Sequence, residues 1–321
     1  MNEPKLCLGP MSKNVVDAAI EFAEDRKISL GLIPSRRQID HQGGYVNWWT
    51  TKKFSKYVRE RSSRLWLIRD HGGGGQGATK DWGFDSLAED SLHFDAIHLD
   101  PWRFNNFNEA LEQTANYLKF CFRQNPNLWF EVGTEEAIQP YSPEQLAELL
   151  DYLENNLSLE EFSQIKYVVI QSGTSIKDGA NTGSYSAEKL TQMLWVAQSY
   201  KLLSKEHNGD FLSANLIREK FAKGLDSINI APELGQIETQ VYLNLIADSK
   251  KPYLFDLFYH LAHTSGKWKK WLSSPKSSEE IIKAAGHYVF SDPKFQVIVN
   301  YFQAEDLIKL KIKQRIGEIL S

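Results

Sequence analysis

The stretch that decides the fold of this chain is LWLIRDHGGGG, residues 65–75. It begins with a short apolar run of the length and aromatic content typical of a buried strand. The run ends in two adjacent polar residues, Asp70 and His71, and the glycines after them allow backbone to approach a ligand closely. The stretch therefore predicts a strand that delivers an acid and an imidazole at its carboxyl end.

Short apolar runs of this kind alternate with longer helical segments along the chain, which is the pattern of a parallel α/β fold. The predicted strands are residues 5–9, 28–33, 65–70, 94–100, 128–132, 166–171, 200–205 and 226–230. Eight strands close a barrel of roughly 250 residues, whereas an open doubly wound sheet needs fewer strands and a glycine fingerprint after the first. We therefore expect an α/β fold, a (β/α)8 TIM barrel over residues 1–248.

The remaining residues, 249–321, are predicted to form a helical extension packed on the barrel. Its aromatic residues Trp268, Trp271, Tyr288 and Phe290 are expected to form the core of this helical cap. The lysine-rich stretches around Lys267 and Lys309 are typical of a solvated face. Within the barrel, Ser142-Pro143-Glu144-Gln145 predicts a helix start, with Ser as the N-cap and Gln three residues later.

The composition indicates one large core and no strong charge. The chain has 321 residues, of which 42% are hydrophobic, and a formal net charge of -4. This balance provides no positive field for nucleic acid or an anionic membrane surface, so we expect neither partner. Two cysteines are too few for a disulfide scaffold, and the sequence shows no secretory signal and no apolar run of membrane-spanning length. A cytoplasmic protein is the expectation.

Polar residues gather at the predicted carboxyl ends of the strands, where barrels of this class carry their active sites. They include Asp70-His71, His98-Leu99-Asp100, Glu131 to Glu135, His207 to Asp210, and Asn229. Taken singly, each has a structural interpretation, because a strand-end Asp commonly caps the next helix and a lone His commonly packs in a core. Their recurrence favours chemistry, since imidazoles and carboxylates converging on one mouth suit a divalent metal with an open coordination position.

Phosphate contacts are expected from glycines, helix starts and arginines at the same mouth. The glycines after Asp70 can form an anion nest or a plain flexible loop, and Arg36 and Arg37 can bind phosphate or form surface ion pairs. We assign substrate and phosphate contacts to Gly72, Gly73, Arg36, Ser175, Asn208, Asp210 and Asn229.

These blocks resemble a known family, the non-catalytic subunits of class II tagatose-bisphosphate aldolase, which are also called tagatose-6-phosphate kinases. The matching residues are Gln38 with Gly43-Gly44-Tyr45, Asp70-His71, Ile97-His98-Leu99-Asp100, Gly133-Thr134-Glu135, Glu206-His207 with Asp210, and Trp268-Lys269-Lys270. The resemblance covers most of the chain, including the extension. The chain is similar, more distantly, to the catalytic class II aldolases.

The resemblance to the catalytic aldolases implies that Asp70 shuttles the proton of the aldol hydroxyl and that His71 and His207 bind a metal. The metal would be Zn²⁺, with Mn²⁺ or Mg²⁺ as alternatives. Those enzymes have a third metal-binding His after the sixth strand, where this chain has none. Glu131, Glu135 or Asp100 can supply the missing ligand; we assign Glu131 to the metal, and Asp100 and Glu135 to catalysis beside Asp70.

A second departure is that Asn208-Gly209-Asp210 replaces the family's Gly-Gly-Ser phosphate turn. The leading hypothesis is a metal-dependent aldolase that acts on a ketose phosphate by aldol cleavage or condensation. One alternative is a sugar-phosphate 4-epimerase that uses retro-aldol chemistry. Another is a non-catalytic subunit that stabilises a catalytic aldolase. A Schiff-base aldolase using Lys205 is a further alternative. The expected partners are a phosphorylated sugar and either an aldolase catalytic subunit or a second copy of the chain.

Overall fold

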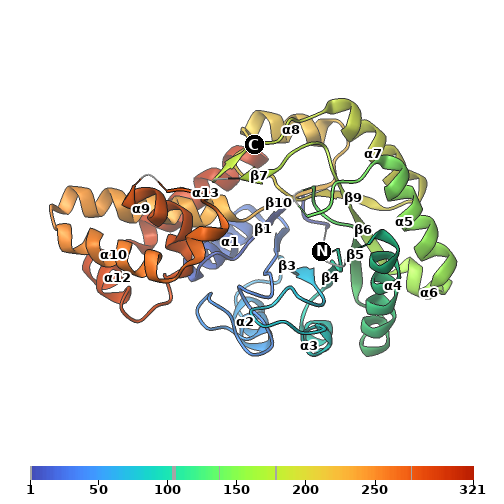
Figure 1. The fold of residues 1–321 in the computed structure, drawn as a ribbon, viewed down its shortest axis with the longest axis horizontal. Coiled ribbons are helices and arrows are strands. Elements are labelled where there is room, and N and C mark those ends of the chain that lie inside the picture. The colour runs from blue at the N-terminus through green and yellow to red at the C-terminus, as the bar shows by residue number, and fades with distance from the viewer. Residues whose placement is uncertain (1, 103–105, 137, 178, 276) are drawn as a thin grey trace.

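The computed structural model describes residues 2–102, 106–136, 138–177, 179–275 and 277–321, and its centre is a closed parallel barrel (Figure 1). The strands close in the order β1-β10-β9-β6-β5-β4-β3-β2. They are β1 (Leu6–Leu8), β2 (Leu30–Leu32), β3 (Leu65–Gly72), β4 (Ala96–Leu99), β5 (Trp129–Val132), β6 (Ile165–Ile170), β9 (Leu203–Glu206) and β10 (Ser227–Ile230). All eight predicted strands, and the (β/α)8 fold class, are confirmed.

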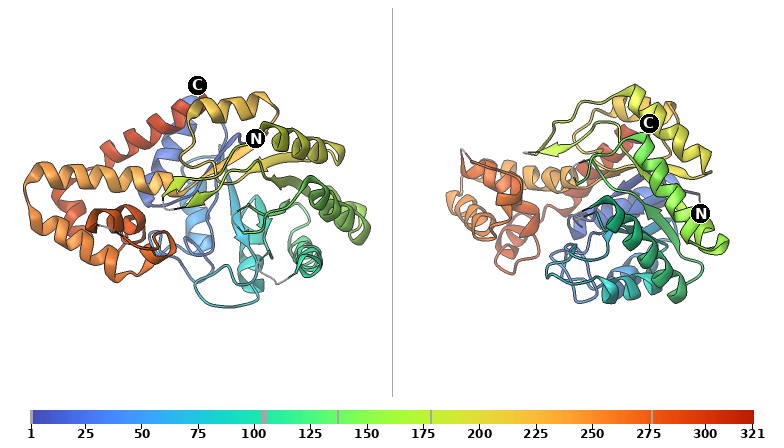
Figure 2. Two further views of the ribbon diagram at one scale, coloured as in Figure 1. Left: turned by 45° about the horizontal axis from the view of Figure 1, so that its top comes forward. Right: turned by 45° about the vertical axis from the view of Figure 1, so that its right-hand side comes forward.

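Helices alternate with these strands and form the outer layer of the barrel (Figures 1 and 2). They are α1 (Lys13–Arg26), α2 (Thr51–Arg59), α3 (Phe84–His93), α4 (Phe107–Gln124), α5 (Pro143–Asn156), α6 (Leu159–Ser163), α7 (Ala187–Ser199), α8 (Ala214–Ala222) and α9 (Pro232–Ser249). A short hairpin, β7 (Ile176–Lys177) and β8 (Ala180–Asn181), follows β6. The predicted start of α5 is confirmed, because Ser142 and Gln145 form a reciprocal capping box. Across the described ranges, no helix has both the length and the apolar character that a membrane crossing requires.

Strand β3 extends two residues beyond the prediction and contains a bulge. Its register against β4 shifts between Arg69 and Gly72, and His71 has a φ of 48°, in the left-handed region that a non-glycine residue rarely adopts. In a regular strand, adjacent side chains point to opposite faces. The bulge redirects the chain, so that Asp70 and His71 both face the mouth of the barrel.

Arg69 anchors this strand from the outside. It is fully buried, and its guanidinium forms a two-pronged ion pair with Asp90 of α3, with both contacts at 2.7 Å. The remaining N–H groups donate to Thr51 and to the carbonyls of Pro34 and Ile39. Because each of the five guanidinium donors has an acceptor, the position of β3 beside α3 is fixed.

The inside of the barrel changes from apolar to polar along the strands. A small apolar cluster, separate from the main core between strands and helices, consists of Cys7, Ile33, Trp66, Ile68 and Ala96. Because side chains two residues apart share a face, the inward face of β3 continues from Ile68 to Asp70, and that of β4 continues from Ala96 to His98. The alternation that fills the barrel therefore also brings polar groups to its mouth.

The extension lies beside the barrel on the side of α1 (Figures 1 and 2). Its elements are α10 (Pro252–Thr264), η1 (Lys267–Lys270), α11 (Ser278–Ala285), η2 (Gly286–Tyr288), α12 (Gln296–Phe302) and α13 (Glu305–Leu320). Helix α13 returns to pack on α1, α8 and α9. Its buried residues recur at helical spacing and are Ile308, Ile312, Ile316 and Ile319. At Gly235 of α9, an added Cβ would lie 2.8 Å from the Cβ of His287, so the extension approaches the barrel closely there.

Replacing Arg69 with Met should leave Asp90 as a buried carboxylate without its partner. Removing one member of a buried ion pair costs about 3–5 kcal/mol, and we expect R69M to lower the free energy of unfolding in urea by about that amount. Arg64→Gln is the matched control, because the ion pair between Arg64 and Glu24 is exposed and such pairs contribute at most about 1 kcal/mol. An equal loss in the two variants would show that the Arg69 pair does not stabilise the fold.

Candidate functional site

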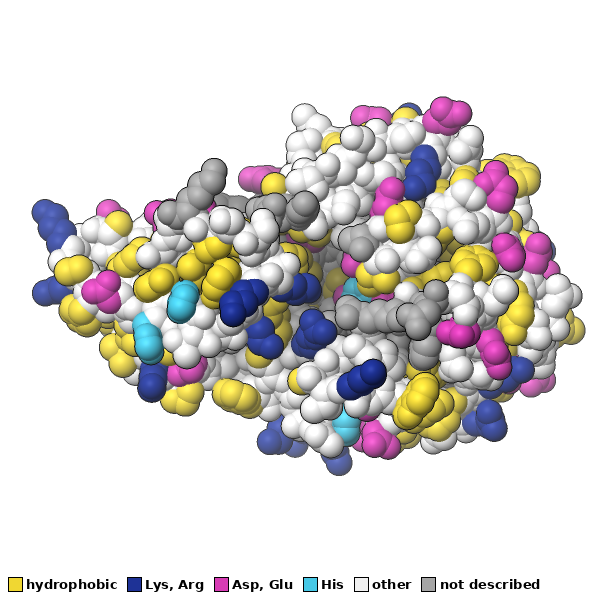
Figure 3. Space-filling view, in the orientation of Figure 1, with side chains coloured by type: hydrophobic (Ala, Val, Ile, Leu, Met, Phe, Trp, Pro, Cys, Tyr) yellow, Lys and Arg dark blue, Asp and Glu magenta, His cyan; other side chains and the backbone are white. Residues whose placement is uncertain are grey.

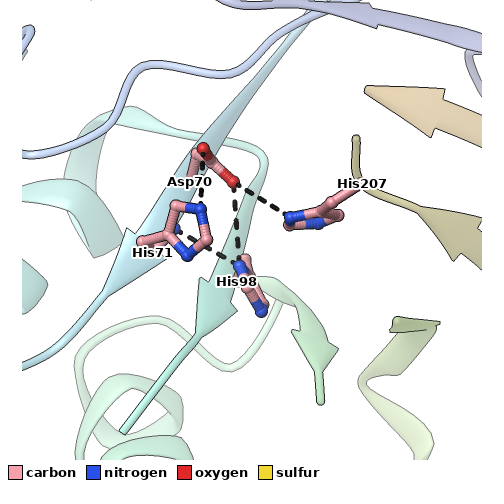
Figure 4. Close-up of side chains that lie close together, drawn as sticks. All are labelled: Asp70, His71, His98 and His207. Atoms are coloured by element: carbon pink, nitrogen blue, oxygen red, sulfur yellow. Dashed lines mark hydrogen bonds and ion pairs between the residues drawn. The ribbon is translucent and has the colours of Figure 1, made fainter. Parts of the chain in front are cut away.

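Four side chains from three strands meet at the mouth of the barrel. They are Asp70 and His71 of β3, His98 of β4 and His207, which follows β9, and one ligand atom of each lies within 4.8 Å of the others. Figure 4 shows Asp70 facing the three imidazole rings. Its carboxylate oxygens lie 3.4 Å from Nε2 of His71, 3.8 Å from Nδ1 of His98 and 3.7 Å from Nδ1 of His207. We call these four residues the histidine cluster.

The nitrogens of His71 and His98 that face away from Asp70 are held by oxygen acceptors. Nδ1 of His71 lies 2.5 Å from Asp100 Oδ2, and Nε2 of His98 lies 2.9 Å from the carbonyl oxygen of Gly133. Burial opposes the charge of Asp100, but His71 beside it keeps the pKa of this carboxyl below its usual value. Since both oxygens accept, the outer nitrogens carry the hydrogens and the inner nitrogens face Asp70.

His207 is held in the same way by Glu131, deeper inside the barrel. Nε2 of His207 lies 2.7 Å from one Glu131 oxygen, and Nζ of Lys205 lies 2.6 Å from the other. Burial would raise the pKa of Glu131, but Lys205 and His207 hold it well below its usual range. Glu131 therefore accepts from both neighbours and turns Nδ1 of His207 toward Asp70. A carboxylate behind a histidine is a common way to orient a metal ligand.

Lys205 belongs to this supporting layer and lies outside the cavity lining among the described residues. Its side chain is buried. Burial by itself would lower the pKa of Lys205, but the acidic groups around it, Cys7 and Glu131, raise it above the ordinary value. The ammonium therefore keeps its proton and has no lone pair with which to attack a carbonyl. This placement argues against the Schiff-base hypothesis.

Asp70 is an ionised carboxylate with an unsatisfied oxygen. Burial would raise its pKa, but His71, His98 and His207 hold it well below the usual range. Conversely, burial disfavours the charge of His71, yet Asp70 and Asp100 raise the pKa of this imidazole to about 10. Oδ1 of Asp70 is buried and has no hydrogen-bond partner among the described residues. A buried anionic oxygen surrounded by imidazole nitrogens is an environment that a bound cation would satisfy.

The histidine cluster opens into a cavity of about 530 Å³ between the barrel and the extension, within the range of small-molecule sites. Figure 3 shows a hollow near the centre of this face, with Lys and Arg side chains gathered on its rim toward the extension. The barrel contributes Asp70, His71, Gln76, Glu135, His207, Asn208, Asp210 and Asn229. The loop after β2 contributes Arg37 and Tyr45, and the extension contributes Lys269, Lys270, Trp271 and Tyr288. Of the aromatic residues expected in the cap core, Trp271 and Tyr288 thus form a cavity wall, while Phe290 is buried.

Two predicted substrate contacts, Asn229 and Asp210, have distinct surroundings in the cavity. Oδ1 of Asn229 is buried and has no hydrogen-bond partner within the described part of the chain, so it can accept a hydrogen bond from a ligand hydroxyl. Asp210 Oδ1 instead accepts from the backbone N–H groups of Ala231 and Glu233, at 2.9 and 2.8 Å. Burial, reinforced by Glu233, raises the pKa of Asp210 to about 8. Because this carboxyl already occupies the start of α9, the expectation of a phosphate at Asp210 is corrected.

The structure places Gly72, Gly73 and Arg36 outside the cavity lining among the described residues, which corrects their assignment as phosphate contacts. A Cβ on Gly73 would lie 2.8 Å from a ring carbon of Tyr117, so this glycine permits close packing. Arg36 is buried and binds Asp81 through two contacts of 2.7 Å, and it also donates to the carbonyl of Gly73. The glycine loop is therefore a packed structure fixed by Arg36.

Three further assignments change. Asp100 and Glu131 lie behind histidines as hydrogen-bond acceptors, and Ser175 lies in the loop before β7, outside the cavity lining of the described residues. The residue beside Asp70 that the sequence analysis left unassigned is His98, which supplies a third imidazole. A usable signal was present, because His98 is two residues beyond the small buried Ala96 and so shares its inward face. Glu135 lines the cavity, and its assignment to catalysis stays a prediction.

No family model matches the sequence, and no curated protein matches it. Solved structures match the fold. A probable tagatose 6 phosphate kinase from Sinorhizobium meliloti 1021 has a TM-score of 0.81 at 15% identity, with 99% of each chain covered. The fructuronate-tagaturonate epimerase UxaE from Cohnella laeviribosi has a TM-score of 0.67 at 11% identity, covering 99% of this chain and 80% of that one. The YdjI aldolase from Escherichia coli K12 has a TM-score of 0.57 at 16% identity, covering 95% and 93%. These neighbours have the fold that the sequence resemblance implies.

The charge balance of the histidine cluster predicts a pH dependence in protein stripped of metal by a chelator. His71 should titrate near pH 10, as its raised pKa requires, whereas an unfolded histidine titrates near pH 6.5. A raised pKa stabilises the fold fully below about pH 6.5, and this stabilisation is lost as the pH rises from about 6.5 to 10. Proton NMR of the imidazole resonances, assigned with His71→Gln, measures the midpoint. Asp70→Asn should lower it; a wild-type midpoint near 6.5 would contradict the proposed charge balance.

Proposed function

We propose that this chain is a divalent-metal-dependent enzyme of the class II aldolase type that cleaves or forms a carbon–carbon bond of a ketose phosphate. The observation that carries the proposal is the histidine cluster: three imidazoles oriented from behind, with their inner nitrogens around the carboxylate of Asp70, whose Oδ1 has no hydrogen-bond partner among the described residues. The cluster lies at the carboxyl ends of the barrel strands and opens into a cavity, as barrel active sites do.

The donor set of the cluster fits a transition metal. His71, His98 and His207 would hold it through their inner nitrogens, a set typical of catalytic zinc sites with an open position. Imidazole donors suit Zn²⁺ better than Mg²⁺, which prefers oxygen. When bound, such a cation polarises a ketose carbonyl and stabilises the negative charge that develops as the carbon–carbon bond breaks.

Asp70 is suited to move the proton of the reaction. The three histidines hold its pKa well below the usual range, so it is ionised at neutral pH; it lines the cavity, and its Oδ1 has no hydrogen-bond partner among the residues that the structure describes. It can therefore accept the proton of the substrate hydroxyl whose carbon–carbon bond breaks, and return it in the condensation direction. Asn229 and Glu135 line the same cavity and are placed to bind other sugar hydroxyls.

A second candidate is a 4-epimerase that breaks and reforms the same bond. It is favoured by the likeness to the epimerase UxaE, which extends over 99% of this chain at a TM-score of 0.67. In this case the same histidine cluster would act, and the two fragments would stay in the cavity. The glycine loop argues against carrying over the kinase name of the Sinorhizobium neighbour, because Gly74 and Gly75 donate their N–H groups to Tyr117 and Asp81 instead of a nucleotide phosphate.

Metal analysis of the purified protein, followed by assays on fructose and tagatose phosphates, tests the proposal. We expect bound divalent metal, activity that is lost with a chelator, and recovery on adding Zn²⁺ or Mn²⁺. Asp70→Asn should lower kcat by about 10²–10⁴-fold, as for loss of an acid–base group, while metal remains bound. His98→Gln should lower metal content, and the exposed His260→Gln serves as its control.

The products distinguish the alternatives. Triose phosphates indicate an aldolase, whereas interconverted hexose phosphates alone indicate an epimerase. A protein that binds no divalent metal, with every assayed activity unchanged in Asp70→Ala and His207→Ala, would overturn the enzyme proposal. That outcome would favour the hypothesis of a non-catalytic subunit, which co-purification with a catalytic aldolase would then test.

A further inference from the structure

Charge is divided between the two sides of the cavity. The acidic residues that line it, among the described residues, are Asp70 near the end of β3, Glu135 after β5 and Asp210 after β9. The cationic side chains Arg37, Lys269 and Lys270 also line it, and Figure 3 shows Lys and Arg side chains gathered on the rim toward the extension. A ligand that spans this cavity would therefore meet histidines and carboxylates at one end and three cations at the other.

Two of these cations, Arg37 and Lys269, are not engaged by a carboxylate among the residues that the structure describes. Arg37 Nε makes a 3.4 Å contact with the carbonyl of Gly77, and within the described ranges neither Arg37 nor Lys269 forms an ion pair. Lys270 lies over the ring of Trp271 at 4.4 Å. The neighbouring Arg36, in contrast, is buried and fully engaged by Asp81 and Asp40. The two adjacent arginines thus have different surroundings: Arg36 is engaged in buried ion pairs, and Arg37 lines the cavity.

The three cations are held on elements that contact one another. Arg37 lies in the loop after β2, and its carbonyl accepts from the backbone N–H of Tyr45 at 3.1 Å. The ring of Tyr45 packs on Tyr288 of the extension, with centroids 4.8 Å apart. Tyr288 in turn accepts a hydrogen bond of 3.2 Å from Nε1 of Trp271, next to Lys270. This aromatic bridge keeps the loop and η1 on the same wall.

The barrel side offers little for a dianion. The start of α9 is occupied by Asp210, and Gly72 and Gly73 lie outside the cavity lining of the described residues. A phosphate placed near Asp70 and Glu135 would also meet like charge. The cationic side has the opposite sign and offers donors suited to phosphate oxygens.

We propose that Arg37, Lys269 and Lys270 form the binding site for the terminal phosphate of the substrate, so that the extension is part of the substrate site. The inference rests on the proposed function for the other end of the ligand, where the sugar carbonyl would meet the histidine cluster. The lysines of η1 then set the substrate class: a phosphorylated ketose is accepted with its phosphate toward the extension and its reacting carbons toward Asp70.

Inorganic phosphate is the probe that tests this site independently of catalysis. Its dissociation constant for the full chain is measured by calorimetry at low ionic strength, where charge interactions are least screened. We expect Arg37→Gln and the double variant Lys269→Gln/Lys270→Gln each to weaken phosphate binding by about tenfold or more, the scale of losing a hydrogen bond to a charged group. Lys267→Gln is the matched control, since Lys267 is exposed on η1 but does not line the cavity.

The outcomes separate this inference from the proposed function. Weaker phosphate binding in the cavity variants, with unchanged metal content, supports the site even if no aldolase or epimerase activity is found. Where activity is found, the variants should raise KM for the ketose phosphate with little change in kcat. Phosphate binding that is equal in wild type, cavity variants and Lys267→Gln would overturn the inference. Binding of glucuronate in preference to phosphate would overturn the phosphate assignment and identify a carboxylate site.

Discussion

The site depends on one departure from regular strand geometry, the bulge in β3. Arg69 points outward and is fixed by its pair with Asp90, while the left-handed backbone of His71 brings this residue to the same mouth as Asp70. Without the bulge, the adjacent acid and imidazole would point to opposite faces of the strand. A left-handed non-glycine residue costs of order 1 kcal/mol or more and persists where surrounding contacts enforce it. Here the Asp100 contact to the ring and the Arg69 anchor do so.

A second layer of hydrogen-bond acceptors inside the barrel orients the imidazole rings of the histidine cluster. Asp100, Gly133 and Glu131 each accept from the outer nitrogen of one ring, so that the inner nitrogens converge on Asp70. Glu131 can be buried as an anion because Lys205 lies on its other side. Preorganised groups of this kind need no rearrangement when charge develops at the cavity floor. The polar residues inside the barrel therefore support the histidine cluster at its mouth.

The extension completes the cavity and places cationic side chains on its rim. It carries η1 and the aromatic residues Trp271 and Tyr288 to the rim, where Tyr45 of the barrel loop packs against Tyr288. The resulting cavity has opposite charge on its two sides, and under the proposed function this division would orient an anionic sugar. Proteins at only 11–16% identity share the fold of this chain.

The sequence alone determined the barrel, because strand period, helix caps such as Ser142 and the count of eight units are local signals. It also predicted that Asp70, His71 and His207 lie at the same mouth of the barrel, since parallel strands end at the same edge. Tertiary structure decided which polar groups face the cavity. Arg36 and Arg37 are adjacent in sequence but have different partners, and the lysines of η1 reach the rim only through packing of the extension. The local sequence pattern does not specify the direction of each side chain or the packing between distant segments. These two features decide which residues face a ligand and which support them from behind.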